Sequence, residues 1–302
     1  MNVPGRRERE RRNAEHDAAP MRAPPALRVD AHHHVWRLAR GDYGWLTPAL
    51  APIHRDFSLD DLRPLLRVAD IGATVLVQAA PTDAETDFLL ATANASAGLV
   101  RGVVGWVDCA GPDAVSRLAA LAHDPLFKSV RPMLQDLPDP EWILRPEVRP
   151  ALAALPGLRL RFDALVTPAQ LPALLAMLDR HPDIAVVIDH GGKPAIGAGA
   201  WEPWAALMAA LARHPLVHCK LSGLVTEAGP AWRVASLARY VEHLLGCFGA
   251  SRLLWGSDWP VVNLAGDYGR WVAAPDALLA GLSGSEREAI RGGNARRFYG
   301  LA

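Results

Sequence analysis

The sequence predicts an α/β protein built as a single (β/α)8 barrel, also called a TIM barrel, and three observations lead to that prediction. Eight short β-type segments alternate with amphipathic helical stretches along the chain. The segments between them are long enough for the crossover that parallel strands require. Near-continuous apolar stretches such as residues 184–189, IAVVID, are typical of strands buried on both faces. A doubly wound open sheet is the competing architecture, but eight β/α alternations without a break in composition favour the barrel.

The sequence predicts eight strands. They are residues 27–32, 73–79, 101–107, 127–133, 158–165, 184–190, 215–223 and 251–259.

Helix signals separate these strands. Ser58 with Asp61 resembles a capping box, and Thr167-Pro168 has N-cap and N1 character before a helix over 169–181. The segment 37–58 is too long for a simple βα loop, so we expect it to form a lid or wall over the barrel mouth.

Composition narrows the class of partner. Lys plus Arg equals Asp plus Glu, 32 each, which argues against nucleic acid or an anionic membrane as the main partner. No apolar run approaches the ~18 residues of a membrane span. Three scattered cysteines give no CxxC spacing, so a reducing, cytoplasmic location is expected. Residues 1–26 are predicted to be a disordered tail before a barrel domain over 27–302, and the sequence leaves open whether Met1 or Met21 is the start.

Three strand ends carry the candidate chemistry. At the C-terminal end of the first strand, His32 and His34 share one face about 6.6 Å apart, while His33 points the other way. His190 stands at the end of the sixth strand beside two glycines, and Asp258 stands at the end of the eighth. In a barrel these ends meet at the mouth, where the histidines could bind metal and Asp258 could act as a general base or a ligand. A solvated His tract, a hydrogen-bonded loop histidine and a turn-capping Asp are the competing interpretations.

Further polar and aromatic residues near strand ends are candidates for binding a substrate. Arg131 offers two aligned donors, and Lys220 alternates with Ser222 on one face. Surface pairing and core packing are the alternatives for these residues. Neither Ser222 nor Cys219 has the setting of a nucleophile, so covalent catalysis is not expected. The candidate substrate-binding residues are Arg131, Trp36, Gln78, Trp106, Lys220 and Trp259.

Taken together, these stretches resemble the amidohydrolase-related TIM-barrel family, in its sugar-lactonase branch of L-fuconolactonases and L-rhamnono-lactonases. The resemblance rests on DAHHHVW, VIDHGGKP, CKLSGL, LLWGSDWPV and the terminal GNARRFYG, and it runs from residue 30 to 301. It implies that the partner is a small-molecule sugar lactone, opened by attack of water on the ring carbonyl with Asp258 as general base. Homo-oligomer formation stays open.

The resemblance also implies that His32, His34, His190 and Asp258 occupy metal-binding positions of the wider superfamily. The expectation is one divalent ion, zinc, held by His32, His34 and Asp258, with His190 as a further ligand or beside the carbonyl. Strand five offers no His and no metal-bridging Lys, which argues against a binuclear centre. Pro132 stands where many relatives carry a His.

Three alternatives stay open. Catalysis without a metal is the first, because lactones are activated esters. A metal-dependent hydrolase or decarboxylase of another small carboxylate or lactone on the same barrel is the second. A non-catalytic sugar-acid sensor is the third.

Overall fold

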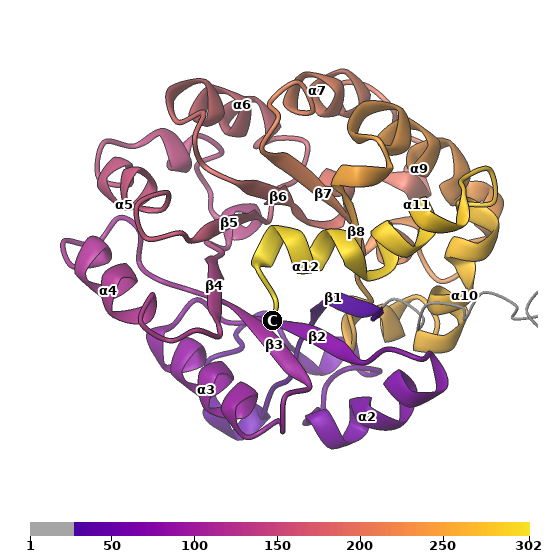
Figure 1. Ribbon diagram of the computed structural model, residues 1–302, viewed down its shortest axis with the longest axis horizontal. Helices are drawn as coiled ribbons and strands as arrows, with labels where there is room; N and C mark the ends of the chain where they lie inside the picture. Colours follow the sequence, from indigo (N-terminus) through magenta and orange to yellow (C-terminus); the bar gives the residue numbers. More distant parts are fainter. Residues whose placement is uncertain (1–26) are drawn as a thin grey trace, which may run out of the picture.

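Eight parallel strands run in the order β1 to β8 around one sheet, each hydrogen-bonded to the next along the chain. The structure is a computed structural model that describes residues 27–302; the predicted tail, 1–26, lies outside them. Strands and helices alternate around the ring (Figure 1). The predicted (β/α)8 barrel is confirmed. The strands are Val29–His33 (β1), Ala73–Val77 (β2), Val100–Gly105 (β3), Phe127–Val130 (β4), Arg161–Ala164 (β5), Val186–Ile188 (β6), Val217–Leu221 (β7) and Leu253–Trp255 (β8).

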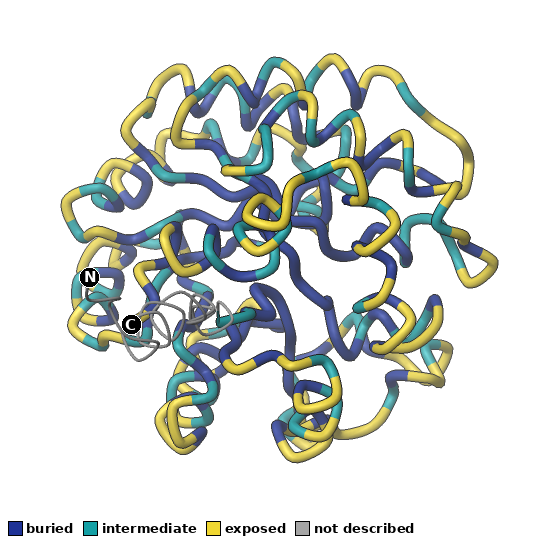
Figure 2. Tube along the Cα trace, turned by 45° about the vertical axis from the view of Figure 1, so that its right-hand side comes forward, coloured by how far each residue is buried: buried dark blue, intermediate teal, exposed yellow. Residues whose placement is uncertain are grey.

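Most helices lie outside the ring of strands, and α12 lies across one end of it (Figure 1). Apolar residues fill the layer between strands and helices. Their outer faces are exposed while the strands are buried (Figure 2). Among residues 27–302 no helix is both long and apolar enough to cross a membrane. The α-helices are Leu59–Val68 (α2), Asp83–Asn94 (α3), Ala114–Leu121 (α4), Arg149–Ala154 (α5), Leu171–Arg180 (α6), Trp204–Leu211 (α7), Leu224–Ala228 (α8), Val234–Phe248 (α9), Tyr268–Leu278 (α10), Gly284–Glu288 (α11) and Asn294–Tyr299 (α12).

The predicted helix starts differ in accuracy. The capping box of Ser58 and Asp61 is present at the start of α2. The helix expected after Thr167-Pro168 begins later, at Leu171. The reason is local: Gln170 Oε1 accepts hydrogen bonds from the backbone N–H and the hydroxyl of Thr167, and this closes a turn before the helix.

The ring closes without a full ladder between its first and last strands. A single parallel bridge joins His33 to Trp259, just beyond β8. The carboxylate of Asp30 adds a second link, since its Oδ1 accepts the backbone N–H of Ser257 at 2.8 Å. At the opposite end of the barrel from the β1 and β8 C-termini, α12 lies across the strands and buries Phe298 and Tyr299 against them (Figure 1).

The long segment after β1 folds back on itself. Trp36 and Phe57 exchange backbone hydrogen bonds at 3.0 Å, which ties its two ends together. Between them lie two short 3-10 helices, Leu38–Arg40 (η1) and Pro48–Leu50 (η2). Trp45 and Leu50 line a cavity at the barrel mouth, so the segment forms part of its wall.

Candidate functional site

The ends of β1 and β8 place three candidate residues together. The backbone N–H of Asp258 donates to the carbonyl of His32, and that of His34 donates to the carbonyl of Trp259, both at 2.7 Å. Gly256 permits this approach, because a Cβ built there would lie 2.7 Å from the Cβ of His32. The two chain segments therefore run in contact, and His32, His34 and Asp258 come from neighbouring backbone positions.

His190 reaches the same point from β6. The chain turns sharply after this strand through a short 3-10 segment, Asp189–Gly192 (η5), in which His190 has φ +54° and the two following glycines also have positive φ. Its Nδ1 lies 2.8 Å from the Ser222 hydroxyl. A Cβ at Gly223 would come within 2.6 Å of the imidazole ring, so this glycine leaves the space that the ring occupies.

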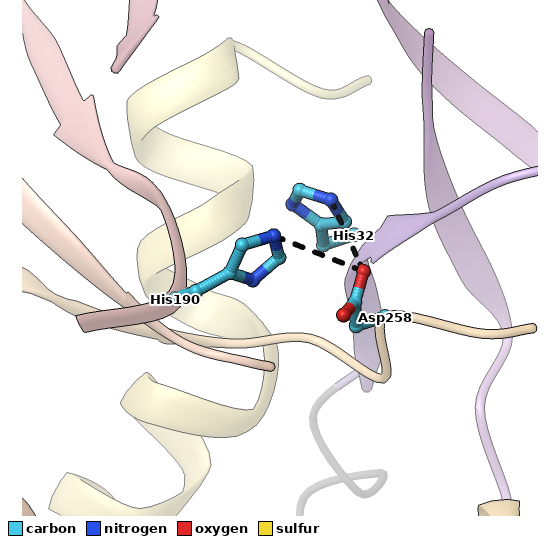
Figure 3. A group of neighbouring side chains, drawn as sticks. All are labelled: His32, His190 and Asp258. Carbon is cyan, nitrogen blue, oxygen red and sulfur yellow. Dashed lines mark ion pairs between the residues drawn. The ribbon is translucent and has the colours of Figure 1, made fainter. Parts of the chain in front are cut away.

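The three imidazoles face one carboxylate oxygen. Their Nε2 atoms lie 3.6 Å (His32), 3.3 Å (His34) and 3.8 Å (His190) from Asp258 Oδ1. His32 and His34, predicted to share a face, have Nε2 atoms 3.2 Å apart. Figure 3 shows that the side chains of His32, His190 and Asp258 come from separate elements of the barrel and point toward one another. The structure thus brings together all four residues that the sequence singled out.

Each imidazole is oriented through its other ring nitrogen. His34 Nδ1 donates to the carbonyl of Val77 at 2.8 Å, and this turns its Nε2 toward Asp258 Oδ1 at 3.3 Å. His32 Nδ1 lies 3.1 Å from Lys220 Nζ and 3.4 Å from Asp189 Oδ1. Partners of this kind fix ring orientation at metal and acid–base sites.

A buried charge network supports His32 from below. Lys220 Nζ contacts Asp163 at 2.6 Å and Asp189 at 2.9 Å, and all three side chains are fully buried. Arg131 pairs with the other Asp189 oxygen at 3.2 Å. The hydroxyl of Tyr299, from α12, donates to Asp163 at 2.7 Å. We call Asp163, Asp189, Lys220 and Tyr299 the floor network.

Sequence reasoning missed Asp163 and Asp189 as members of this network. A signal for them existed, because a carboxylate inside an otherwise apolar strand needs a buried partner. Asp189 lies within VVIDH and Asp163 within RFDAL, but the identity of the partner depends on three strands meeting in space.

Burial and neighbours set the protonation states. Burial alone would raise the pKa of the Asp258 carboxyl, but His190 and a hydrogen bond from His34 outweigh it and hold that pKa below its ordinary value. Burial lowers the pKa of His190 to about 4. Burial, together with the Lys220 charge, keeps the pKa of His32 well below its usual range. Near neutral pH the site therefore holds an ionised carboxylate and uncharged rings at His32 and His190.

These residues meet the requirements of a divalent cation. His32, His190 and Asp258 each offer a ligand atom, and the three atoms lie within 4.8 Å of one another. Neutral imidazoles and a carboxylate are donors that first-row divalent metals accept. The site is compatible with one divalent metal, with His34 Nε2 beside it.

A cavity of about 260 Å³ opens above the cluster. Among its lining residues, Gln135 Oε1, Thr226 Oγ1 and Arg131 Nε are shielded from solvent and make no hydrogen bond within the described chain. Gln135 and Thr226 lie outside the strands, and no pattern in the sequence marked them. We call this cavity the site cavity. It is lined by His34, Trp45, Leu50, Ala79, Arg131, Met133, Gln135, Asp136, Leu165, His190, Lys193, Thr226, Asp258, Val261 and Leu264.

The predicted substrate-binding residues separate into groups. Arg131 lines the site cavity, whereas Trp106 lines a neighbouring one. Gln78 is fully buried, and its amide donates to the Arg131 carbonyl at 2.8 Å. Lys220 belongs to the floor network and has no exposed surface.

Trp36 and Trp259 also stand away from the lining of the site cavity. Trp36 is fully buried under the 37–58 segment, with its Nε1 donating to the Arg55 carbonyl at 2.7 Å. Trp259 packs edge-on against Phe57 at 5.2 Å between ring centroids. Both rings pack against the segment that forms the wall of the site cavity, on the side away from the cavity.

Comparisons with known proteins find relatives that cover nearly the whole chain. A relative from Burkholderia ambifaria named L-fucono-1,5-lactonase is 48% identical over 90% of this chain and 95% of its own length. A second protein of that name, from Burkholderia multivorans, is 37% identical over 91% of this chain and 97% of its own. A crystal structure of an amidohydrolase from Burkholderia multivorans with bound zinc superposes with a TM-score of 0.87, at 36% identity, covering 92% of this chain and 100% of that one.

A family model describes the whole barrel. The amidohydrolase model matches residues 29–301, which include every candidate site residue. With this match and the relatives above, the chain belongs to the amidohydrolase family.

Proposed function

We propose that this protein is a lactonase that opens a sugar-derived aldonolactone by hydrolysis. The observation that carries the proposal is the cluster itself: an ionised carboxylate faced by three imidazoles below a small cavity with unpaired polar atoms. Unpaired, shielded donors and acceptors in a cavity suit a ligand rich in hydroxyl groups. The names of the two Burkholderia relatives support the same substrate class.

In this mechanism Asp258 is the general base. Its carboxylate removes a proton from water as the water oxygen bonds to the lactone carbonyl carbon. The carbonyl oxygen gains negative charge, and Arg131 Nε, an unpaired donor that lines the site cavity, stabilises that charge. The bond to the ring oxygen then breaks, and the proton held by Asp258 passes to that oxygen. The product is the open-chain hydroxy acid.

We also propose zinc as the divalent ion of this site. His32, His190 and Asp258 would hold it, with His34 as a further ligand. A bound zinc ion supplies Lewis acidity toward carbonyl oxygen and water. The donor set supports this choice, and so does the zinc in the related structure.

The test is proton release from L-fucono-, L-rhamnono- and L-galactono-lactones, measured before and after chelator treatment. Turnover of at least one lactone is expected, lost on chelation and restored by zinc. Turnover that survives chelation would retain the lactonase and overturn the zinc proposal. No turnover in any condition would overturn the lactonase.

Asp258→Asn tests the base. The expected result is a fall in kcat/KM of about 10²- to 10⁴-fold, the range typical of a lost general base, with the melting temperature preserved. Activity within tenfold of the parent protein would exclude Asp258 as the base.

A further inference from the structure

A second and larger cavity adjoins the site cavity. Its volume is about 600 Å³, against about 260 Å³ for the site cavity, and Trp45, Met133 and Asp136 line both. We call it the annex. It is lined further by Asp42, Trp106, Asp108 and Trp142, and the proposed reaction uses none of these residues.

The annex has the surface chemistry of a sugar-binding subsite. Three half-buried tryptophans, Trp45, Trp106 and Trp142, contribute to its walls. Flat aromatic side chains present apolar surface to which the C–H face of a sugar ring can pack. Trp45 is fixed in place, because its Nε1 donates to the Ala79 carbonyl at 2.7 Å.

Carboxylates supply the polar part of the annex. Asp42, Asp108 and Asp136 line it, and no Lys or Arg does so among the described residues. One oxygen of Asp42, Oδ2, is held by Arg40 at 2.5 Å and by Thr82 at 3.2 Å. The other, Oδ1, is shielded from solvent and accepts no hydrogen bond from the described residues. It is therefore available to a ligand that donates a hydrogen bond.

The negative charge of these carboxylates excludes an anionic substituent from the annex. A phosphate or carboxylate substituent would meet three carboxylates, and Arg40, which pairs with Asp42, does not itself line the annex. A purely apolar substituent would leave the shielded Asp42 oxygen without a partner. A neutral ring with several hydroxyl groups can donate hydrogen bonds to the carboxylates and pack its C–H face against the tryptophans.

We propose that the annex binds a second sugar ring, so that the substrates include glycosylated aldonolactones derived from disaccharides. The lactone ring would occupy the site cavity, and the attached glycosyl unit would pass Trp45 and Met133 into the annex. This inference rests on the proposed lactonase activity and extends it to a larger substrate class.

The test compares matched substrates. Lactones are prepared by oxidising disaccharides that carry L-fucose at the reducing end, linked at O2, O3 or O4, and each is compared with L-fuconolactone itself. At least one glycosylated lactone is expected to match or exceed the kcat/KM of L-fuconolactone. If all of them fall a hundredfold or more below it, the annex does not bind a second ring.

Variants of the annex residues test whether activity on the glycosylated lactones depends on this cavity. Trp142→Ala should lower kcat/KM for the glycosylated lactone about tenfold, equivalent to about 1.4 kcal/mol, and leave L-fuconolactone within twofold. Trp142→Phe, which keeps an aromatic face, is the matched control, and Trp106→Ala is the second variant if Trp142→Ala does not fold. An equal loss on both substrates would overturn the annex proposal. Failure of the parent protein on L-fuconolactone and every other lactone would instead identify the lactonase proposal as the error.

Discussion

Lys220 is the residue on which the floor of the site depends. Its ammonium group lies within 3.1 Å of His32, Asp163 and Asp189, all fully buried. A buried charge that loses its partner is far more costly than an exposed one, because solvent cannot replace the interaction. The sequence pattern suggested a role for Lys220 in contacting the substrate, but its position is that of a support for His32.

Lys220→Met should therefore lower the free energy of unfolding by about 3–5 kcal/mol, measured by urea denaturation. Adding Asp163→Asn to that variant removes one of the two stranded carboxylates and should recover part of the loss. Strictly additive losses in the double variant would show that Lys220 and Asp163 are not coupled.

Thr226 is a candidate for recognising a substrate hydroxyl, because it lines the site cavity and its shielded Oγ1 has no hydrogen-bond partner among residues 27–302. Thr226→Val keeps the shape and removes the hydroxyl, so kcat/KM for the best lactone should fall about tenfold through KM, as expected for one lost hydrogen bond. Thr226→Ser keeps the hydroxyl and should stay within threefold. Steady-state kinetics of the two variants test this role. If both variants lose kcat/KM equally, Thr226 contributes through packing alone.

At the scale of elements, α3 anchors the segment that walls the site. Glu85, in its first turn, accepts hydrogen bonds from the Tyr43 hydroxyl at 2.7 Å and the Ala79 backbone at 3.0 Å. Arg40 lies 3.5 Å away, and Asp42 is also close enough to act on its charge. Burial raises the pKa of Glu85 to about 7, although these hydrogen bonds and Arg40 oppose the rise.

This raised pKa makes stability depend on pH. Between the unfolded value near 4.5 and the folded value near 7, the folded protein holds more protons than the unfolded chain. Stability must then fall as pH rises through that window, by at most about 3 kcal/mol. Glu85→Gln cannot ionise, so its melting temperature should decline less than that of the parent protein between pH 5 and pH 8. Parallel melting profiles for the two proteins would contradict the assignment.

The strands show what the sequence could predict at this scale. Alternation along 27–32 and 251–259 was enough to place His32 and Asp258 at one barrel end, because parallel strands align their C-termini. The sequence could not show that Trp36 is covered, since this depends on residues 37–58 folding back to Phe57. Gln135 and Thr226 were missed for a related reason: they lie in a three-residue 3-10 helix and a five-residue α-helix, which are too short to show a periodicity that marks side-chain direction.

At the scale of the whole molecule, closure of the barrel and assembly of the site depend on the same contacts. The barrel was predictable because eight alternations of strand and helix allow few other arrangements. The point of closure was not, because β1 and the segment after β8 meet through one bridge and the side chains of Asp30 and Ser257 instead of a ladder. His32 and Asp258 lie on the two sides of that junction, joined by a backbone hydrogen bond of 2.7 Å.

Asp30 is the side chain that holds this junction. Its carboxylate accepts hydrogen bonds from the backbone N–H groups of His32 and Ser257 and from the hydroxyl of Tyr268, all buried. Asp30→Ala leaves these donors unpaired and should lower the free energy of unfolding by about 2–4 kcal/mol. The site spans the junction, so within each protein activity and helical circular dichroism should be lost at the same urea concentration. That concentration should be lower for the variant than for the parent protein. If activity disappears well before the helical signal, the first and last strands separate locally, and the site is less stable than the barrel that carries it.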